Sequence, residues 1–461
     1  MQQHHVGLAG QNADAIVSGL EQLHGNITVM QVCLDVAELA ALAGNGSIDV
    51  AVIVEQTEHI TLSLMQRFHE QRVAVVVLTD VASERQRCFF LGAEVAGTQQ
   101  TPQQLAELIL QSLRTTSFAP RTDLDTDLAG VEPADFLVHP PPVEESVGVE
   151  PDQEEPIPEG QVITFWGPMG SPGTTTLAVN AAAEYAIAGK NTLLIDADTH
   201  AASVTAMLGL LEESSGLSQL CRLAELGTLT EDSFQKGLDT VTIGPVNFGV
   251  LSGIPHPARW PELRRPALEQ VLALARKNYD VIVVDTAGPL DQDEELSFDV
   301  VVPQRNAATL FALEQAELVF AVGTADVVQL PRLLRLIPDL LEVIGPHTSV
   351  RYVVNKVDEA SVGGQAEEQL RYSWARFSPA SSEEVEFLPA AGNVLSQAML
   401  AGQTLAEAAK DDPLRQAVQG LLGVPVQQRR GLLPRWLNGT KDAKSQAQRW
   451  RRKPRGRRAK V

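Results

Sequence analysis

The sequence predicts an α/β protein with two parallel-sheet domains, an acidic disordered segment between them and a basic tail after them. Three observations predict it. Short apolar runs alternate with helical patterns over residues 1–118 and again over 161–423, as in sheets covered by helices on both faces. A glycine-rich loop joins the first strand and helix of the second region. Charge sets two further segments apart, 119–160 and 424–461.

The composition limits the class of protein. The chain has 461 residues, of which 44% are hydrophobic, enough for two or three domains with ordinary cores. No apolar run approaches the roughly eighteen residues of a membrane span, and residues 1–10 do not follow the pattern of a secretory signal. Cys33, Cys88 and Cys221 are too few and too far apart for a disulfide framework. We therefore expect a cytoplasmic protein.

The net charge of −22 combines two segments of opposite sign. Residues 121–160 hold twelve acids, one base and seven prolines, which predicts a disordered linker over 119–160. The tail 424–461 holds thirteen Lys or Arg and one acid, with Trp436 and Trp450 on the apolar side of a helical wheel. This pattern favours contact with an anionic membrane, and the same charge would bind DNA. A solvated tail that contacts the acidic linker is the alternative, and the residues leave the choice open.

Residues 1–118 are expected to form a parallel sheet of five strands with helices between them. The expected strands are His5–Ala9, Ile27–Val32, Val50–Val54, Val73–Leu78 and Glu94–Gly97. The expected helices are Asp14–Leu23, Val36–Ala43, Leu62–Gln71, Ser83–Leu91 and Thr101–Leu113.

The segment from Val75 to Glu94 resembles the later half of a response-regulator receiver domain. Such a domain holds Mg²⁺ with acids after its first strand and takes a phosphoryl group on an Asp after its third. In this chain those positions are Leu8–Gln11 and Val54-Glu55, and the expected lysine near Thr98–Gln100 is missing. We expect a degenerate receiver-like interaction module without phosphoryl chemistry; an unrelated small α/β domain is the alternative.

A glycine-rich loop follows the expected strand Val162–Trp166. It is Gly167-Pro168-Met169-Gly170-Ser171-Pro172-Gly173-Thr174-Thr175-Thr176, and the helix after it runs to Ile187. Glycines let successive backbone N–H groups converge on phosphate oxygens, and the helix N-terminus adds a partial positive charge. A hydroxyl at the start of the helix, here Thr175, is the expected Mg²⁺ ligand. The loop therefore predicts a phosphate site.

Three further expected strands end in polar residues. They end at Asp196-Ala197-Asp198, at Asp285-Thr286-Ala287-Gly288 and at Asn355-Lys356-Val357-Asp358. A single Asp after a strand is commonly just the N-cap of the next helix. Because ligands bind at the carboxyl ends of parallel strands, these ends together with the loop favour a nucleotide–magnesium site.

These landmarks resemble the MinD/ParA group of P-loop ATPases over about 260 residues of this chain. With a receiver-like domain in front, the chain looks like the CpaE/TadZ pilus-assembly proteins. Leu251–Pro255 and Ala401–Leu405 are similar to the actinobacterial septum-site-determining branch. The resemblance implies a protein that binds ATP and Mg²⁺, forms a nucleotide-linked homodimer, and positions a septum site or Flp/Tad pilus assembly. Its implied partners are pilus or division machinery at the membrane, pole or septum.

The resemblance also assigns roles to residues. Mg²⁺ falls to Thr175 and Asp285, and the orientation of the attacking water falls to Asp198 as the catalytic residue. Adenine falls to Asn355 with Pro389. The phosphates fall to the loop residues Gly167, Gly170, Ser171, Gly173, Thr174, Thr175 and Thr176.

The loop departs from the family at its two lysines, whose positions are Met169 and Thr174. Phosphoryl transfer depends on neutralising the developing negative charge, and losing one such donor costs about a hundred- to thousand-fold in rate. We expect weak or absent ATP hydrolysis, with a pseudo-ATPase scaffold as the alternative. Lys356, Arg259 and Arg264 are the candidate substitute cations.

GTP binding is a further alternative. Asp285–Gly288 fits the Asp-x-x-Gly motif of GTPases, and Asn355–Asp358 fits their Asn-Lys-x-Asp motif. A carboxylate at Asp358 would accept hydrogen bonds from two guanine protons that adenine lacks. The loop and the Asp196/Asp198 pair favour ATP over GTP.

Overall fold

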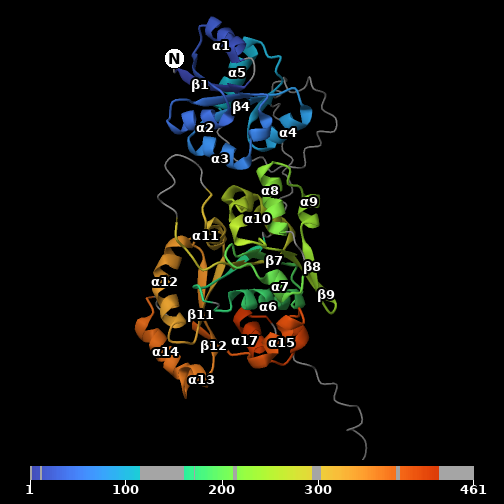
Figure 1. Cartoon of the computed structure of the whole chain (residues 1–461), viewed down its shortest axis with the longest axis vertical. Coiled ribbons are helices and arrows are strands. Elements are labelled where there is room, and N and C mark those ends of the chain that lie inside the picture. The colour runs from blue at the N-terminus through green and yellow to red at the C-terminus, as the bar shows by residue number, and fades with distance from the viewer. Residues whose placement is uncertain are drawn as a thin grey trace, which may run out of the picture. The chain divides into compact units, whose positions relative to one another are not determined.

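The computed structural model describes residues 3–10, 13–114, 160–170, 172–210, 215–292, 303–379 and 385–424. The chain divides into two compact units, Met1–Val424 and Pro425–Val461. The first unit contains two separate sheets (Figure 1). The predicted linker up to 159, the predicted basic tail beyond Val424 and the site residue Ser171 lie outside the described residues. Within the described ranges, no helix is both long enough and apolar enough to cross a membrane.

The first sheet is parallel and has the strand order β2-β1-β3-β4-β5, the order of doubly wound receiver-like folds. All the predicted strands and helices are present, with ends within one residue of the prediction. The strands are β1 His4–Gly10, β2 Ile27–Cys33, β3 Val50–Val54, β4 Ala74–Leu78 and β5 Glu94–Ala96. The helices are α1 Ala13–Gln22, α2 Val36–Gly44, α3 Leu62–Glu70, α4 Ala82–Phe90 and α5 Pro102–Ser112, with the 3₁₀ turn η1 Thr57–His59.

Each face of the first sheet has its own apolar core. Helices α2, α3 and α4 cover one face with residues such as Leu39, Phe68 and Cys88, and α1 and α5 cover the other with Leu20 and Ile109. Because both faces are covered, β3 and β4 are buried at every position, which explains their unbroken runs of Val, Ile and Ala. The predicted α/β fold class is confirmed here.

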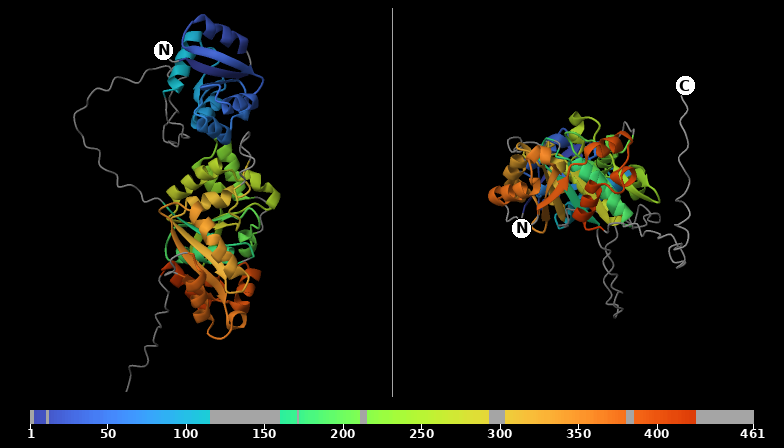
Figure 2. Two further views of the ribbon diagram at one scale, coloured as in Figure 1. Left: turned by 90° about the vertical axis from the view of Figure 1, so that its left-hand side faces the viewer. Right: turned by 90° about the horizontal axis from the view of Figure 1, so that it is seen from below.

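The second sheet has eight strands in the order β13-β12-β11-β6-β10-β7-β9-β8, parallel except for the antiparallel pair β8 and β9. Strands β11, β12 and β13 lie side by side in orange in Figure 2. The strands are β6 Gln161–Trp166, β7 Thr192–Ala197, β8 Asp239–Ile243, β9 Val246–Leu251, β10 Val281–Thr286, β11 Leu318–Thr324, β12 Ser349–Val357 and β13 Val385–Pro389.

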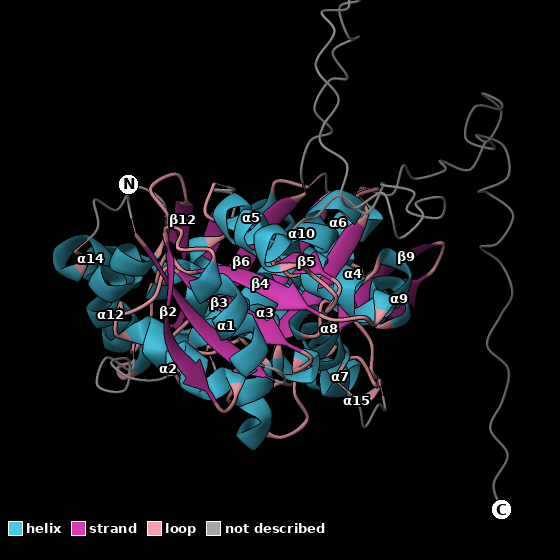
Figure 3. Cartoon of the chain, turned by 90° about the horizontal axis from the view of Figure 1, so that it is seen from above, coloured by secondary structure: helices cyan, strands magenta, loops and turns pink. Residues whose placement is uncertain are grey.

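Helices cover both faces of this sheet. Figure 3 colours the helices cyan and the strands magenta. Helices α8, α10, α11, α12 and α14 pack on one face, and α6, α7, α16 and α17 pack on the other. The helices are α6 Thr174–Ile187, α7 Val204–Met207, α8 Gly216–Glu225, α9 Glu231–Lys236, α10 Arg265–Asn278, α11 Ala307–Glu314, α12 Gln329–Val343, α13 Glu359–Val362, α14 Ala366–Phe377, α15 Gly392–Leu400, α16 Leu405–Ala408 and α17 Pro413–Leu422, with the 3₁₀ turn η4 Pro257–Glu262.

The strand order places the predicted loop at the middle of the sheet. Strand β6 lies between β10 and β11, so the loop after it has the ends of both neighbours beside it. The sequence predicts site residues directly after four of these strands, which are β6, β7, β10 and β12. Strand β11 is also largely buried, but it ends in Thr324 and not in an acid, so its sequence alone does not connect it with the site.

Candidate functional site

The loop Gly167–Thr176 connects β6 to α6, as predicted. Val162 to Pro168 are buried, whereas Met169 and Gly170 are exposed at the tip of the loop. Helix α6 begins at Thr174, and Gly173 is its N-cap. Because the strand and the helix are packed on the core, the loop between them is held at both ends.

The loop requires glycine at three positions. Gly170 and Gly173 have φ of 124° and 101°, conformations that other residues rarely adopt. A Cβ on Gly167 would come within 2.3 Å of the Val322 carbonyl oxygen, and one on Gly173 within 2.4 Å of the Asn355 amide nitrogen. The backbone of β11 and the side chain of Asn355 therefore press against the loop, which keeps its N–H groups in a compact turn.

Helix α6 presents hydroxyls and free backbone donors at its start. Thr174, Thr175 and Thr176 form its first turn and are half-buried. The first backbone bond of the helix runs from the Leu177 N–H to the Gly173 oxygen, so the N–H groups of the three threonines have no acceptor within the helix. Gly173 has no side chain to cap them. This is the arrangement that binds anions at helix N-termini.

Two predicted acids, Asp196 and Asp285, lie directly opposite each other on neighbouring strands β7 and β10. Asp196 is buried and accepts backbone hydrogen bonds of 3.0 Å from Ser203 and Val204. Asp285 is fully buried, and neither of its oxygens has a hydrogen-bonding partner of normal geometry among the described residues. Burying a carboxylate without a hydrogen-bonding partner costs free energy of folding, so Asp285 is a candidate for binding a ligand.

Burial raises the pKa of both acids. The pKa of Asp196 rises to about 7, with the nearby Asp198 adding to the effect and backbone hydrogen bonds opposing it. The pKa of Asp285 lies well above its usual range because of burial and the Asp196 carboxylate, although the nearby Thr175 hydroxyl lowers it. The site therefore holds more negative charge than it can stabilise by itself, and a divalent cation would relieve this.

Thr175 and Asp285 fit the predicted role of Mg²⁺ ligands. A hydroxyl and a carboxylate are hard oxygen donors, and Mg²⁺ in nucleotide sites takes one or two such groups beside water and phosphate oxygens. Among the described residues there is no cluster of three or more His, Cys, Asp or Glu side chains placed for a metal. The assignment stays a prediction.

Asp198, the predicted catalytic residue, lies in the turn after β7. Its Oδ1 accepts hydrogen bonds from the backbone N–H groups of His200 and Ala201 at 2.8 and 2.9 Å. The residue is half-buried, and its charge contributes to the raised pKa of both Asp196 and Asp285. The structure thus brings Asp198 into the same acidic group, and its role toward water stays a prediction.

Asn355, the predicted adenine contact, is buried against the loop. Its amide nitrogen donates to the Pro172 carbonyl at 3.0 Å, and its oxygen accepts from the Lys356 N–H at 2.8 Å. Pro389 ends the neighbouring strand β13 and is half-buried at the same edge of the sheet, paired with Val357. Asn355 therefore connects β12 to the phosphate loop, and its contact with a base stays a prediction.

Asp358, the residue expected to contact guanine in the GTP alternative, makes a contact within its own segment. Asp358 accepts a hydrogen bond from the Ala360 N–H at the start of α13, and Lys356 is exposed with φ of 57°. The carboxylate thus serves the next helix in this structure, while GTP binding stays untested.

The end of β10 is locked to the loop. The Trp166 indole N–H donates to the Gly288 carbonyl at 3.0 Å, and Trp166 is fully buried. A Cβ on Gly288 would lie 2.8 Å from both the Gly167 oxygen and the Met169 nitrogen. The Asp285–Gly288 segment and the loop Gly167–Thr176 are therefore in direct contact.

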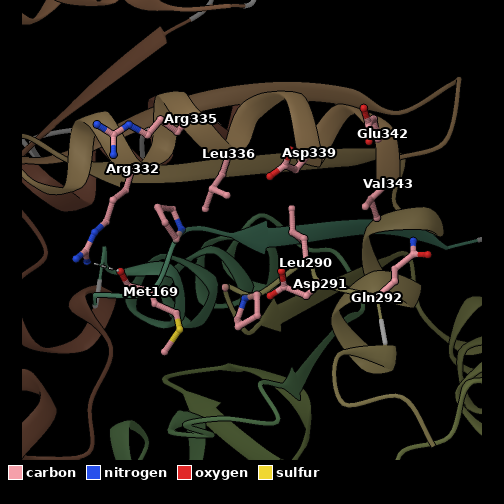
Figure 4. Close-up of a pocket in the computed structure, with 13 residues that line it drawn as sticks. Met169, Leu290, Asp291, Gln292, Arg332, Arg335, Leu336, Asp339, Glu342 and Val343 are labelled. Carbon is pink, nitrogen blue, oxygen red and sulfur yellow. Dashed lines mark hydrogen bonds between the residues drawn. The ribbon is translucent and has the colours of Figure 1, made fainter. Parts of the chain in front are cut away.

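A cavity of about 980 Å³ opens beside this contact (Figure 4). Pro168 and Met169 of the loop and Gly288 to Gln292 after β10 form one side, and α12 forms the other. The residues of α12 that line it are Arg332, Arg335, Leu336, Asp339, Glu342 and Val343.

The substitute cations considered from the sequence do not reach the loop through any described contact. Arg259 pairs with Glu262 at 2.7 Å, which raises the pKa of the guanidinium. Arg332 of α12 does reach it, since its Nη1 donates to the Met169 carbonyl at 3.3 Å. Sequence reasoning missed Arg332 because no local pattern links a helix after β11 to the loop after β6. The signal that would have helped is the buried apolar run of β11, which places that helix beside the loop.

The positions of the first sheet where a receiver domain would carry its phosphoryl site make other contacts. Val54, at the predicted acceptor position, is buried, and Asp80 accepts hydrogen bonds from the Thr98 N–H at 2.8 Å and from the Thr98 hydroxyl. Thr98 stands where a receiver would carry its lysine, and these bonds lower the pKa of Asp80. Asp80 is therefore used to join the ends of β4 and β5.

Comparisons with known proteins agree with the position of the loop. The family model described as "AAA domain" matches residues 160–297. No curated protein matches the chain.

Solved structures with a similar chain path include a cell division ATPase, a cell division protein complex and a plasmid partition protein. The cell division ATPase MinD of Pyrococcus furiosus has 16% identity over 57% of this chain and 97% of its own, with a TM-score of 0.41. The Aquifex aeolicus MinC:MinD complex has 18% identity over 59% of this chain and 99% of its own, with a TM-score of 0.41. A plasmid partition protein of Borrelia burgdorferi bound to AMPPNP has 15% identity over 58% of this chain and 98% of its own, with a TM-score of 0.43.

Proposed function

We propose that this chain binds ATP with Mg²⁺ in the loop Gly167–Thr176 and that binding controls its self-association. One observation carries the proposal. A loop with free N–H groups at a helix start lies beside Asp285, a fully buried carboxylate whose oxygens lack partners among the described residues. A Mg²⁺–triphosphate supplies what each of the two features needs, anionic oxygens for the N–H groups and a cation for the carboxylate.

When bound, Mg²⁺ would neutralise charge on the phosphates, and the chain's own residues would position them. The N–H groups of the first turn of α6 bind phosphate oxygens, while Thr175 and Asp285 hold the cation. Asn355 keeps the loop closed through its bond to the Pro172 carbonyl. Asp198 orients water near this group of acids. With Met169 and Thr174 in place of lysines, hydrolysis is slow or absent, since two charge-neutralising donors are lost.

The biological role that fits this chemistry is spatial positioning, at a septum site or in Flp/Tad pilus assembly, as in the MinD/ParA group that the sequence resembles. The chain would act as a homodimer that recruits pilus or division machinery. The related Aquifex structure is itself titled a MinC:MinD complex.

The test is calorimetry on the full chain with Mg-ATP, Mg-ADP and Mg-GTP, and light scattering in the same solutions. We expect ATP to bind and to raise the molecular mass to that of a dimer. Thr175→Ala should weaken ATP binding at least ten-fold by removing a Mg²⁺ ligand, whereas Thr228→Ala, at an exposed threonine outside the site, should not. A preference for GTP would replace ATP in the proposal, and no binding of either at millimolar nucleotide would end it.

A second candidate function is a scaffold that keeps the fold without a nucleotide cycle. The observation in its favour is the sequence from Gly160 to Gly189, which contains no Lys, Arg or His. A scaffold would have the same mass with and without Mg-ATP and would be unaffected by Asp198→Ala. A nucleotide-dependent change of mass excludes it.

A further inference from the structure

The phosphate loop has no cation of its own, yet a triphosphate needs one. From Gly160 to Gly189 there is no basic residue, and the two positions where related loops carry lysine are Met169 and Thr174. Helix dipole and backbone donors supply only partial charges. A full positive charge near the loop therefore has to come from another segment.

Helix α12 lies against the tip of the loop. The Arg332 Nη1 donates to the Met169 carbonyl at 3.3 Å, as the dashed line in Figure 4 shows. With the Gln329 amide turned over, its nitrogen donates to the same carbonyl at 3.3 Å and its oxygen accepts from Arg332 at 3.2 Å. A Cβ on Gly170 would come within 1.8 Å of the terminal amide group of Gln329. Gln329 and Arg332 thus contact the loop at adjacent residues.

The position of Arg332 is fixed by its helix. Asp326 accepts hydrogen bonds of 2.8 Å from the N–H groups of Val328 and Gln329 and so holds the start of α12. Leu330, Leu333 and Ile337 are buried in the core under the helix, a spacing of three and four that commits one face to the sheet. Arg332 and Arg335 are therefore held on the exposed face beside the loop.

The guanidinium of Arg332 is free to take an anion. Neither Arg332 nor Arg335 forms an ion pair with any described residue. The described acceptors of Arg332 are both neutral, namely the Met169 carbonyl and, with the amide turned over, the Gln329 oxygen. A phosphate is a much stronger acceptor, and Arg binds it with charge-assisted, often bidentate hydrogen bonds.

The cavity of about 980 Å³ places this charge on the phosphate side of the site. It is lined by Arg332, by Met169 of the loop and by Gly288, which follows the Asp285 strand. Its acids on α12, Asp339 and Glu342, lie farther along the helix, Glu342 about 15 Å from Arg332 at 1.5 Å per residue. On the α12 wall, the positive end of the cavity is therefore the end that borders the loop, while Asp291 lines the opposite wall.

We infer that Arg332 supplies the cation that Met169 and Thr174 omit, and that it contacts the terminal phosphate of a bound nucleoside triphosphate. The inference rests on the proposed nucleotide binding and says how the site would prefer a triphosphate to a diphosphate. Arg332 distinguishes triphosphate from diphosphate, because only the triphosphate presents a terminal group beyond the part held by α6. Arg335, one turn along α12, has no described contact with the loop and takes no part.

The test compares the dissociation constants of Mg-ATP and Mg-ADP by calorimetry on the full chain. In Arg332→Ala we expect ATP to bind about ten- to a hundred-fold more weakly, the loss of one charge-assisted contact, and ADP to change less than three-fold. Arg332→Lys should recover part of the ATP affinity. Arg335→Ala is the matched control, expected to stay within three-fold of the wild type for both nucleotides.

Each other outcome overturns the inference in a recognisable way. Unchanged ATP affinity in Arg332→Ala, with wild-type binding intact, rejects Arg332 while the proposed function stands. An equal loss for ATP and ADP means that Arg332 only supports the shape of the loop. A wild-type chain that binds neither nucleotide rejects the proposed function together with the inference.

Discussion

Replacing Asp285 by asparagine should stabilise the protein without nucleotide and abolish its stabilisation by Mg-ATP. The carboxylate is fully buried, its oxygens have no described partner, and burial with the opposing Asp196 holds its pKa well above the usual range. Asparagine has nearly the same shape and no charge to bury. We expect the free energy of unfolding in EDTA at pH 8 to rise by about 1–3 kcal/mol, because asparagine removes the cost of ionising or protonating a carboxyl in this buried site.

The pH dependence follows from the direction of the pKa shift. A carboxyl whose folded pKa is raised binds its proton more tightly in the folded state, so its protonated form is compatible with folding and its ionised form opposes it. The destabilisation by Asp285 is therefore absent below the unfolded pKa of about 4 and grows as the pH rises through the folded pKa. The advantage of Asp285→Asn should be large at pH 8 and nearly absent at pH 4.

The assay is urea unfolding followed by tryptophan fluorescence, since Trp166 is buried next to Gly288. A second series with Mg-ATP measures the nucleotide-dependent gain in stability, which should be present in the wild type and absent in Asp285→Asn. The reasoning is refuted if Asp285→Asn is less stable than the wild type in EDTA at pH 8. An equal gain at pH 4 and pH 8 would also refute it, because the effect would then not come from ionisation.

Two further predictions concern stability and the tail. Glu184→Ala should cost about 3–5 kcal/mol in urea unfolding, because it leaves the buried Arg415, bonded to Glu184 at 2.5 Å between α6 and α17, without a counter-charge; Asp232→Ala, from the exposed pair with Lys236, is the control and should cost less than about 1 kcal/mol. Removal of residues 425–461 should abolish co-sedimentation with anionic vesicles in low salt; undiminished binding by the shortened chain would disprove membrane attachment through the tail, and retention on DNA alone would assign it to nucleic acid.

Local sequence patterns were sufficient for the first sheet and for the loop. Runs such as Val50–Val54 can only be buried strands between helices, and the 3.6-residue spacing of the apolar residues in Leu62–Gln71 fixes a helix. The glycine-rich sequence predicted a tight loop, and the positive φ of Gly170 and Gly173 agrees with that prediction. These features depend on neighbouring residues, so the order of the residues determines them.

Contacts between distant segments were not predictable in the same way. That Asn355 bonds to Pro172 depends on β12 and on the loop after β6 meeting at one edge of the sheet, which no local pattern encodes. That Asp285 has no described partner depends on every group packed around it.

The sequence by itself determined the first sheet, four strands of the second sheet and the glycine-rich loop with Met169 and Thr174, because backbone periodicity and glycine requirements act over a few residues. The tertiary structure alone decided which cation faces that loop. Arg332 lies 163 residues beyond Met169 and reaches it only because β11 pairs with β6 and α12 packs above their edge. Strand order is a property of the packed sheet, so the contact between Arg332 and the loop became visible only in three dimensions.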